Sequence, residues 1–588
     1  MATTILRRED VDFLLYDWLA ADRLLTQPRY CAHSRETFDG FLDLCADLAR
    51  DAFLPCFKAS DEFEIKLADG EVTVLPQLAE ALKQYAELGL SAASFPEERG
   101  GAGLPFLIST AGLAWFAAAN FSATAYALLT AANARLIAAF GSDEQVSTFA
   151  LPQIEGRWFG TMCLSEPQAG SSLADVLTKA WPDGRDYLGD RYRLNGNKMW
   201  ISGGAHDITE NIVHLVLAKI PASDGTLPQG STGLSLFIVP AVLPSGERND
   251  IAVAGLNHKM GNRGTANCLL NFGERDGAVG WRIGKEGDGL RQMFMMMNEA
   301  RISVGLCAAA IATRGYYLAV DYAKGRVQGR LGNAGSAPVP IIEHADVKAM
   351  LLAQKCYAEG SLALCFYGAA LVDREHEDPD SAALLALLIP VIKTWPSEFG
   401  LKANDLAIQV HGGYGYTRDF DVEQLYRDNR LNPIHEGTTG IQGIDLVARK
   451  ILRPAKGWSV LKERIHRTID AARANPDLQD LAGHLSGGLD DVERVKDAMK
   501  DMDEKEALAN ATSFLFAFGH LVVGWLWLDL AVTACERADL ALGEHDDLAP
   551  GKVVACKYFY AYEMPRVAAW LSCITGRECI LEAPTSVF

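Results

Sequence analysis

RYRLNGNKMWISGG, residues 191–204, mixes aromatic and apolar residues with polar ones and ends on two glycines. A short run of this kind, closed by a turn signal, predicts a β-strand. Similar runs lie on both sides of it, each bounded by Gly, Pro, Asn or Asp: WFGTMCL (158–164), NIVHLVLAKI (211–220), GLSLFIVP (233–240) and ANCLLNFG (266–273). We therefore expect a β domain in the middle of the chain.

Helical patterns flank this β domain. Residues 38–57, 74–90 and 107–140 carry apolar side chains at i, i+3, i+4 spacing, and the same periodicity returns after about residue 279. A Pro/Gly break at RPAKGW (453–458) opens a further helical segment. We predict a mainly α fold with an inserted β domain. Its parts are N-terminal helices (1–158), the β domain (159–278), a helical bundle (279–455) and a C-terminal helical extension (456–588).

Composition disfavours several classes of function. The 588 residues carry a formal net charge of −20, which opposes binding to nucleic-acid phosphates. The 12 cysteines are scattered, without a CxxC pair or ligand spacing to a histidine pair. This pattern is typical of reduced thiols rather than of disulfides or a metal site. We expect no nucleic-acid partner and no metal.

Two apolar runs are candidates for membrane spans. FLFAFGHLVVGWLWL (514–528) is shorter than the roughly 20 residues needed to cross a bilayer, and it contains His520. AALLALLIPVIKTW (382–395) contains Pro390 and Lys393. Both are interpreted as helices buried in a bundle. The first 25 residues lack a signal-peptide pattern, so we expect no membrane span and a cytoplasmic location.

NPIHEGTTGIQ, residues 432–442, places the single carboxylate of Glu436 in a nearly uncharged segment. Two interpretations are open on the residues alone. An acid just before a helical pattern complements the helix dipole. A carboxylate among apolar and small residues also has the raised basicity that a catalytic base needs.

Three other Gly-, Ser- or Trp-containing segments lie at boundaries of the predicted domains. CLSEPQAGSSLADV (163–176) is either a turn or a set of N–H and hydroxyl donors for a ligand. Trp200 is either a core residue or a cover for a planar ring. QVHGGYGYTRDF (409–420) lets the backbone approach a ligand at Gly412 and Gly413. No P-loop and no strand-linked GxGxxG is present, which disfavours nicotinamide binding by a Rossmann unit.

Five motifs together carry a resemblance to one family. MCLSEPQAGSSLADV, YRLNGNKMWISGG, RVQGR, QVHGGYGYTRDF and YRDNRLNPIHEGTTGIQ occur in the order and spacing of acyl-CoA dehydrogenases, over about residues 40–455. The N-terminal segment and the C-terminal extension resemble the large bacterial branch of fatty acyl-CoA and 3-(methylthio)propanoyl-CoA dehydrogenases. The resemblance implies the family's α/β-barrel-like/α arrangement with an additional C-terminal helical domain.

The resemblance also implies a set of FAD-binding residues. One group would lie along the flavin and the other would reach the adenosine diphosphate part of FAD bound in the neighbouring subunit of a homodimer. The first group is Met162, Leu164, Ser165, Gly170, Ser171, Trp200, Ile201, Ser202 and Thr438; the second is Arg326, Gln328, Gln409, Gly412 and Gly413.

For the substrate, the resemblance implies that Glu436 removes the α-proton of an acyl thioester. The thioester oxygen would accept a hydrogen bond from the backbone N–H of Glu436. The acyl-CoA contacts implied are Ser171, Asn298, Arg301 and Gly437; Asn298 and Arg301 are equally compatible with solvated or capping residues on a helix. His435 replaces the Tyr found in many relatives, so it either changes the hydrogen bonding of the base or fills space.

The predicted function is FAD-dependent oxidation of medium- to long-chain fatty acyl-CoA to trans-2-enoyl-CoA in β-oxidation, with electrons passed to an electron-transferring flavoprotein. Three alternatives stay open. They are 3-(methylthio)propanoyl-CoA dehydrogenation, an acyl-CoA oxidase, and the DNA-associated flavoprotein branch of the superfamily. Residues 456–588 contain more acids than bases, which argues against the last of these.

Overall fold

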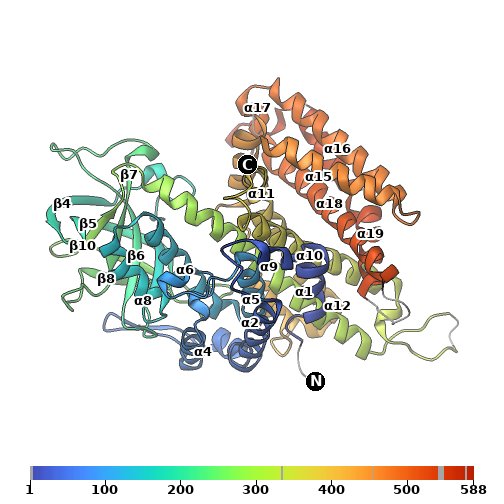
Figure 1. Ribbon diagram of the computed structural model, residues 1–588, viewed down its shortest axis with the longest axis horizontal. Coiled ribbons are helices and arrows are strands. Elements are labelled where there is room, and N and C mark those ends of the chain that lie inside the picture. The colour runs from blue at the N-terminus through green and yellow to red at the C-terminus, as the bar shows by residue number, and fades with distance from the viewer. Residues whose placement is uncertain (1–3, 333–334, 454–455, 541–547, 577–578) are drawn as a thin grey trace. The chain divides into compact units, whose positions relative to one another are not determined.

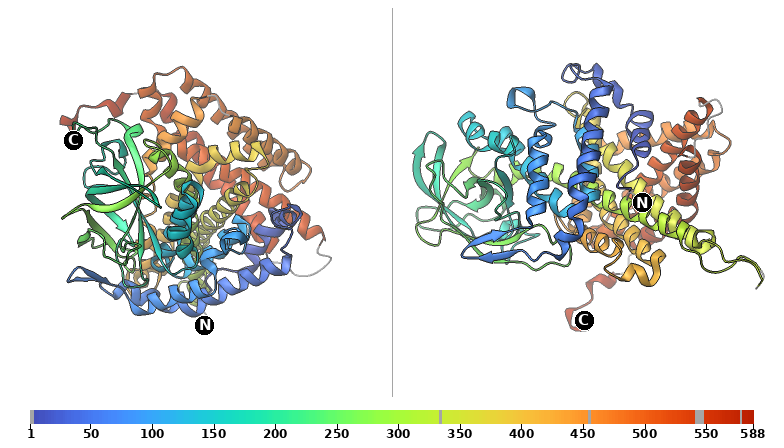
Figure 2. Two further views of the ribbon diagram at one scale, coloured as in Figure 1. Left: turned by 60° about the vertical axis from the view of Figure 1, so that its left-hand side comes forward. Right: turned by 90° about the horizontal axis from the view of Figure 1, so that it is seen from below.

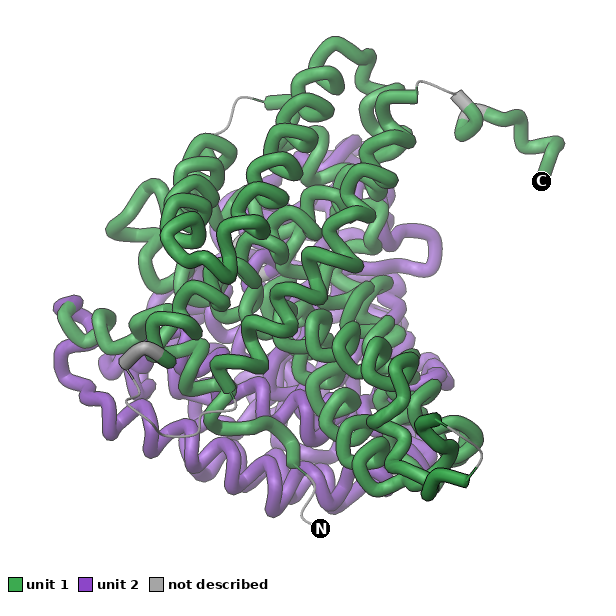
Figure 3. The backbone as a smooth tube through the Cα atoms, turned by 90° about the vertical axis from the view of Figure 1, so that its right-hand side faces the viewer, with its two compact units in different colours: residues 1–26, 301–588 green, residues 27–300 purple. Residues whose placement is uncertain are grey.

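The computed structural model describes residues 4–332, 335–453, 456–540, 548–576 and 579–588. The chain forms two compact units (Figure 3). One comprises Gln27–Ala300, and the other joins Met1–Thr26 to Arg301–Phe588. The predicted order of helices, strands, helices and a further helical domain is confirmed (Figure 1).

The first part of the Gln27–Ala300 unit is helical. Its longer helices are α2 (Arg35–Leu48), α4 (Pro76–Glu87), α5 (Phe106–Ala119) and α6 (Phe121–Phe140). Asn120 separates α5 from α6 within the run that the periodicity predicts as helix. Its backbone is extended, and its side chain accepts a hydrogen bond from the N–H of Ala123, which caps α6. A two-stranded hairpin, β1 (Lys66–Ala68) and β2 (Glu71–Thr73), was not predicted.

The β domain is an eight-stranded sheet that curls on itself. Its strands are β3 (Phe159–Cys163), β4 (Lys179–Asp186), β5 (Gly189–Ser202), β6 (Ile212–Lys219), β7 (Leu234–Pro240), β8 (Ile251–Leu256), β9 (Asn267–Phe272) and β10 (Ala278–Ile283). The order β10-β7-β6-β4-β5-β9-β8 closes because β10 also pairs with β5, and β3 pairs with β6 in parallel. This closure is the barrel-like part of the expected arrangement.

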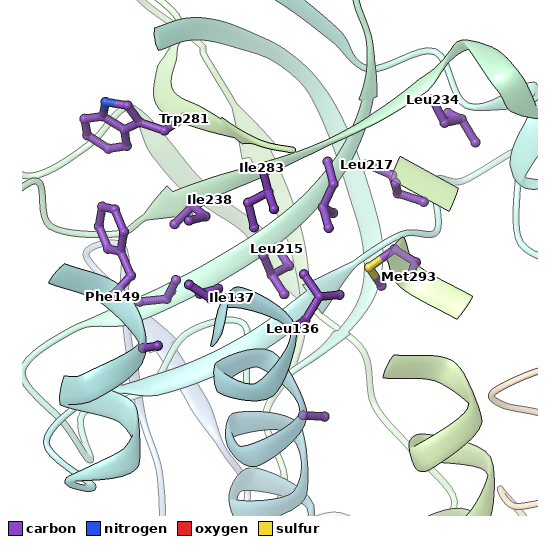
Figure 4. Close-up of a cluster of buried hydrophobic side chains, with 14 of the residues drawn as sticks. Leu136, Ile137, Phe149, Leu215, Leu217, Leu234, Ile238, Trp281, Ile283 and Met293 are labelled. Carbon is purple, nitrogen blue, oxygen red and sulfur yellow. The ribbon is translucent and has the colours of Figure 1, made fainter. Parts of the chain in front are cut away.

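A buried apolar cluster joins this sheet to α6 (Figure 4). Leu136 and Ile137 of α6 point toward Leu215 of β6 and Ile238 of β7, with Ile283 of β10 beside them. All five are fully buried. Met162 of β3 and Leu164, which follows that strand, pack against this cluster.

The second unit is a stack of helices. It contains the C-terminal part of α9 (Gly289–Gly325), then α10 (Ala345–Val372), α11 (Pro379–Trp395), α12 (Leu401–His411), α13 (Val422–Asn429) and α14 (Thr439–Ile444). The extension adds α15 (Lys456–Arg473), α16 (Gln479–Lys500), α18 (Ala511–Leu540), α19 (Leu548–Tyr558) and α20 (Pro565–Thr575), which lie side by side (Figure 2).

Residues 4–26 pack in this second unit, although the sequence analysis placed them with the N-terminal helices of residues 1–158. The buried ammonium of Lys552 in α19 lies 2.7 Å from Asp10 and 2.8 Å from Glu359 of α10. Burial acts to raise the pKa of Asp10, but Lys552 lowers it to about 2. The ion pairs therefore tie the segment around Asp10 to the C-terminal extension.

Four stretches among the described residues are long and apolar enough to cross a membrane by length and composition: Phe121–Phe140, Gly289–Gly325, Pro379–Tyr416 and Ala511–Ala538. In each, 56–89% of the most apolar window is buried inside the structure. The two runs singled out in the sequence lie in α11 and α18, where their apolar side chains pack against other helices.

The helix that follows Glu436 packs closely on the extension. A Cβ placed on Gly443 of α14 would lie 2.9 Å from the backbone carbonyl carbon and oxygen of Ala511, at the start of α18. Only glycine allows this approach, because backbone atoms cannot move aside as a flexible side chain can.

Replacing Gly443 with alanine is expected to force α14 away from α18. We expect Gly443→Ala to lower the free energy of unfolding by about 1–3 kcal/mol, as for other overpacked contacts. Gly487→Ala in α16 is the matched control, because a Cβ there meets nothing within 4 Å. The control should be neutral or stabilising by up to about 1 kcal/mol. Chemical denaturation of both variants measures this, and equal stabilities would contradict the packing argument.

Candidate active site

Glu436 lies in a tight turn between α13 and α14. Its φ is +52°, a left-handed conformation that is rare for a residue with a side chain, and Gly437 follows at φ +88°. Helix α14 is capped by Thr438, whose hydroxyl accepts from the N–H of Ile441 at 3.4 Å. Glu436 therefore does not act as the acid of a helix start. Strain of this kind in a side-chain-bearing residue often marks a functional site.

Two hydrogen bonds hold this turn through its carbonyl groups. Gln442 donates from Nε2 to the carbonyl oxygen of Glu436 at 2.9 Å, and Lys393 donates from Nζ to that of Gly437 at 2.8 Å. Lys393 is fully buried in α11. The adjacent Thr439 hydroxyl donates to Glu398. The two carbonyls are thus fixed by protein side chains.

The reactive groups of Glu436 are left unpaired. Among the residues the structure describes, neither its carboxylate nor its backbone N–H makes a hydrogen bond, and the side chain is partly buried. Burial raises the pKa of Glu436, while the charges of Arg301 and Lys393 oppose that rise. A carboxylate with raised basicity and an adjacent free N–H suits removal of a weakly acidic C–H proton.

His435, beside the base, is held away from it. Its Nε2 shares a 3.0 Å hydrogen bond with Asn432. Burial, together with the nearby Lys393, lowers the pKa of His435 to about 3, so the imidazole is neutral. The structure gives His435 a partner other than the carboxylate of Glu436.

The two predicted acyl-CoA contacts on α9 differ in environment. Asn298 is exposed, whereas Arg301 is buried and lies 3.2 Å from Asp445. Asp445 also pairs with Arg449 at 3.3 Å. Arg301 therefore faces the base turn and its supporting helices, and its contact with CoA stays a prediction, as do those of Asn298 and Gly437.

In the other unit, the two predicted flavin segments meet. The N–H of Met199 donates to the carbonyl of Ser165 at 3.0 Å, which joins the segment after β3 to the end of β5. Trp200 sits at a β-bulge with φ +66°, and its indole is 58% exposed, which excludes a buried core tryptophan. Next to it, Ile201 is buried, and Ser202 accepts from Asn267 at 3.1 Å.

The remaining members of this group lie along the same segment. Met162 and Leu164 are partly buried against the apolar cluster, whereas Gly170 and Ser171 are exposed on the following turn. The exposed indole of Trp200 offers a face on which a planar ring can stack.

A buried ion pair joins these flavin segments. Glu166 lies 2.9 Å from Lys198, whose ammonium also donates to the carbonyl of Leu164 at 3.0 Å. Glu166 further accepts from the N–H of Leu177 and from the N–H of Thr178. Burial acts to raise the pKa of Glu166, but Lys198, the hydroxyl of Thr178 and the N–H of Leu177 lower it overall. The ionised pair therefore positions both segments.

Four of the five residues in the second group of predicted cofactor residues line a cavity of about 450 Å³ in the helical unit. Arg326, Gln328, Gly412 and Gly413 all contribute to its wall, and Arg326 donates to Gln328 at 2.7 Å. Gly412 has a φ of +62°, and a Cβ on it would meet nothing within 4 Å. An exposed guanidinium beside open backbone suits a diphosphate. Gln409 is exposed on α12 but does not line the cavity, and Thr438 lies in the base turn.

Sequence reasoning missed four residues that organise the site: Lys393, Gln442, Glu166 and Lys198. The sequence held a signal for Lys393, because a lysine between Ile392 and Trp395 in an apolar helix must bury its charge against a partner. Glu166 and Lys198 lie inside quoted motifs, but they are 32 residues apart and only the fold pairs them. Nothing in the sequence indicated the role of Gln442.

Four family models match the chain in sequence. They are the acyl-CoA dehydrogenase N-terminal domain (residues 60–157), middle domain (161–274) and C-terminal domain (287–452), and an acetyl-CoA dehydrogenase C-terminal-like domain (461–583). The last of these matches the predicted extension.

Curated relatives match over nearly the whole length. The chain is 33% identical to 3-methylmercaptopropionyl-CoA dehydrogenase of Ruegeria pomeroyi, covering 92% of each chain. It is 31% identical to the broad-specificity linear acyl-CoA dehydrogenase FadE5 of Mycobacterium tuberculosis, covering 95% of each. It is 30% identical to a butyryl-CoA dehydrogenase of Syntrophomonas wolfei, covering 95% of this chain and 94% of that one.

Solved structures share the fold at lower identity. Caenorhabditis elegans ACDH-11 in complex with C11-CoA matches with a TM-score of 0.79 and 20% identity, over 97% of this chain and 94% of that one. A Bacillus anthracis acyl-CoA dehydrogenase complexed with FAD matches with a TM-score of 0.73 and 20% identity, over 96% of this chain and 91% of that one. The likeness extends through the C-terminal helices.

Glu166→Gln should leave Lys198 as an uncompensated buried charge. Breaking a buried pair in this way typically lowers the free energy of unfolding by about 3–5 kcal/mol. Glu71→Gln is the matched control in the same unit, because its ion pair with Arg248 is exposed and worth about 0–1 kcal/mol. Denaturant titration compares the two variants. If Glu166→Gln is no less stable than the control, the pair does not hold the flavin segments.

Proposed function

This chain belongs to the acyl-CoA dehydrogenase family, and on that premise we propose that it oxidises linear acyl-CoA thioesters to trans-2-enoyl-CoA with Glu436 as the base. It is an oxidoreductase of that family. The observation that carries the proposal is the turn at Glu436, where a partly buried carboxylate with a raised pKa is unpaired beside an unpaired backbone N–H.

The residues present fit FAD as the cofactor. The cavity bearing Arg326, Gln328, Gly412 and Gly413 would hold the diphosphate part, and the exposed Trp200 with Ser165 and Ser202 would border the ring. When bound, FAD supplies the two-electron acceptor for the hydride that leaves Cβ.

The protein's own groups act on the Cα side. The carboxylate of Glu436 accepts the Cα proton, and the electron pair of that C–H bond becomes part of the new α,β double bond. As charge develops on the thioester oxygen, the free N–H of Glu436 is available to donate to it. Gln442 and Lys393 keep the neighbouring carbonyls turned to the protein, so the N–H is not consumed internally.

The acyl group is proposed to be a medium to long straight chain. Support for a linear chain comes from the broad-specificity linear relative at 31% identity and the butyryl-CoA relative at 30%. The 33% identical relative named for 3-methylmercaptopropionyl-CoA makes that short thioether substrate the second candidate. Electrons are proposed to pass to an electron-transferring flavoprotein.

A homodimer in the cytoplasm completes the proposal. Arg326 and Gln328 are exposed, as expected of residues that would reach FAD of a partner subunit. The cysteines that the structure describes are free thiols, which supports a reducing compartment.

Replacing the base should separate binding from chemistry. Glu436→Gln is expected to retain yellow FAD and to bind acyl-CoA, because the amide fills the same volume. Flavin reduction by substrate should fall by about 10²–10⁴-fold, because the group that accepts the proton is lost. Stopped-flow absorbance at the flavin band measures this, with Glu423→Gln on α13, 13 residues upstream of the base, as the control. Reduction at the wild-type rate would remove Glu436 from the mechanism.

A ladder of acyl-CoA substrates tests the chain-length proposal. Flavin bleaching should be fastest with medium and long straight chains. Faster bleaching by 3-(methylthio)propanoyl-CoA than by any straight chain would favour the second candidate. Rapid peroxide formation without an added acceptor would instead indicate an oxidase.

A further inference from the structure

We propose that Lys393 is a positioning residue for Glu436, whose ammonium fixes the left-handed turn of the base and places a positive charge beside that turn. This inference rests on the proposed function. It adds a residue that belongs to none of the predicted site groups and lies 43 positions upstream of the base.

The buried ammonium of Lys393 binds the turn that carries Glu436. Lys393 is 0% exposed, and its Nζ lies 2.8 Å from the carbonyl oxygen of Gly437, one residue from the base. That bond accounts for one of its three N–H donors, and no other hydrogen bond of this ammonium occurs within the described chain. A buried ammonium with unused donors requires a nearby negative charge.

The helix that carries Lys393 is anchored on its other side. Trp395, two residues further along α11, donates its indole N–H to Nδ1 of buried His520 in α18 at 3.1 Å. His520 in turn lies 3.3 Å from Glu563. Lys393 is therefore fixed on a rigid element, as a positioning residue must be.

The charged groups around Lys393 and Glu436 come from several elements, and most of them have hydrogen-bond or ion-pair partners. Glu398 accepts from Thr439, Arg301 pairs with Asp445, and His435 is neutral. Charged groups on α11 and on the helices packed against it are paired as well: Asp380 of α11 with Lys456 of α15, and Glu359 of α10 with Lys355 and Lys552. Of the two carboxylates whose charges act on Lys393, Glu398 has a hydrogen-bond partner, whereas Glu436 has none among the described residues.

The charges of Lys393 and Glu436 affect each other's pKa. Burial lowers the pKa of Lys393 to about 8, and the charge of Glu436 opposes that fall. Burial raises the pKa of Glu436, and the charge of Arg301, followed by that of Lys393, opposes this rise. Removing the positive charge should therefore raise the pKa of Glu436, so that the base stays protonated to a higher pH.

The test compares Lys393→Met and Lys393→Arg with Lys402→Met, an exposed lysine of α12 paired with Asp405. The FAD-loaded variants are titrated by infrared spectroscopy, with Glu436→Gln as the blank that identifies the carboxyl band. The rate of flavin reduction is measured over the same pH range. The infrared readout reports the ionisation of Glu436 independently of turnover.

In Lys393→Met, the Glu436 titration and the acid limb of the rate should both move to a pH higher by roughly 1–3. At pH values below the acid limb, the variant should reduce its flavin about tenfold more slowly than the wild type for each pH unit by which the limb has shifted. Lys393→Arg keeps a permanent charge, so its acid limb should stay near that of the wild type while any ionisation near pH 8 disappears. Lys402→Met should match the wild type.

An unmoved Glu436 titration in Lys393→Met overturns the inference, even if that variant is less stable. If Lys393→Met does not fold, persistence of the wild-type alkaline ionisation in Lys393→Arg overturns it. Failure of every acyl-CoA to bleach the wild-type flavin would instead refute the proposed function, and the infrared titration would still decide the role of Lys393.

Discussion

The contact between the ammonium of Lys393 and the carbonyl of Gly437 is the interaction on which the rest of the site depends. It holds two consecutive left-handed residues in place, one of them a glutamate that has no intrinsic preference for that conformation. A Cβ at Gly437 would lie 2.6 Å from Nε2 of Gln442, so the second hydrogen bond of the turn also requires glycine there. Backbone strain, a buried cation and an unpaired carboxylate are thus parts of one arrangement.

The architecture was largely predictable from the sequence because its signals are local. The strand run 211–220 appears in the structure as β6, whereas the helical region expected from residue 279 begins only with α9 at Gly289, because β10 occupies Ala278–Ile283. Asn120 shows the limit of that reasoning: one polar residue in an apolar helical run ended one helix and capped the next. The placement of residues 4–26 beside α19 could not be predicted, since it depends on ion pairs between Asp10 and Lys552.

The candidate site was predictable to the extent that its residues are contiguous. Glu436 and the segments around Ser165 and Trp200 were found because each lies in a short motif. Their supports were not found, because Lys393 and Lys198 act across distances in sequence that only folding closes. The left-handed backbone of Trp200 and Glu436 was also invisible, since no residue type in those motifs announces it.

The tie between Asp10 and Lys552 has a consequence for how the protein is made. The partners are 542 residues apart, so the segment around Asp10 leaves the ribosome long before its binding site exists. Closing so long a loop is entropically unfavourable and slow, and the buried aspartate must remain hydrated until α19 is synthesised. Gly443 waits a shorter time for its partner, because Ala511 is synthesised only after α15 and α16. The helical unit therefore matures only once α19 has emerged, whereas Gln27–Ala300, continuous in sequence, can fold while the ribosome is still at work.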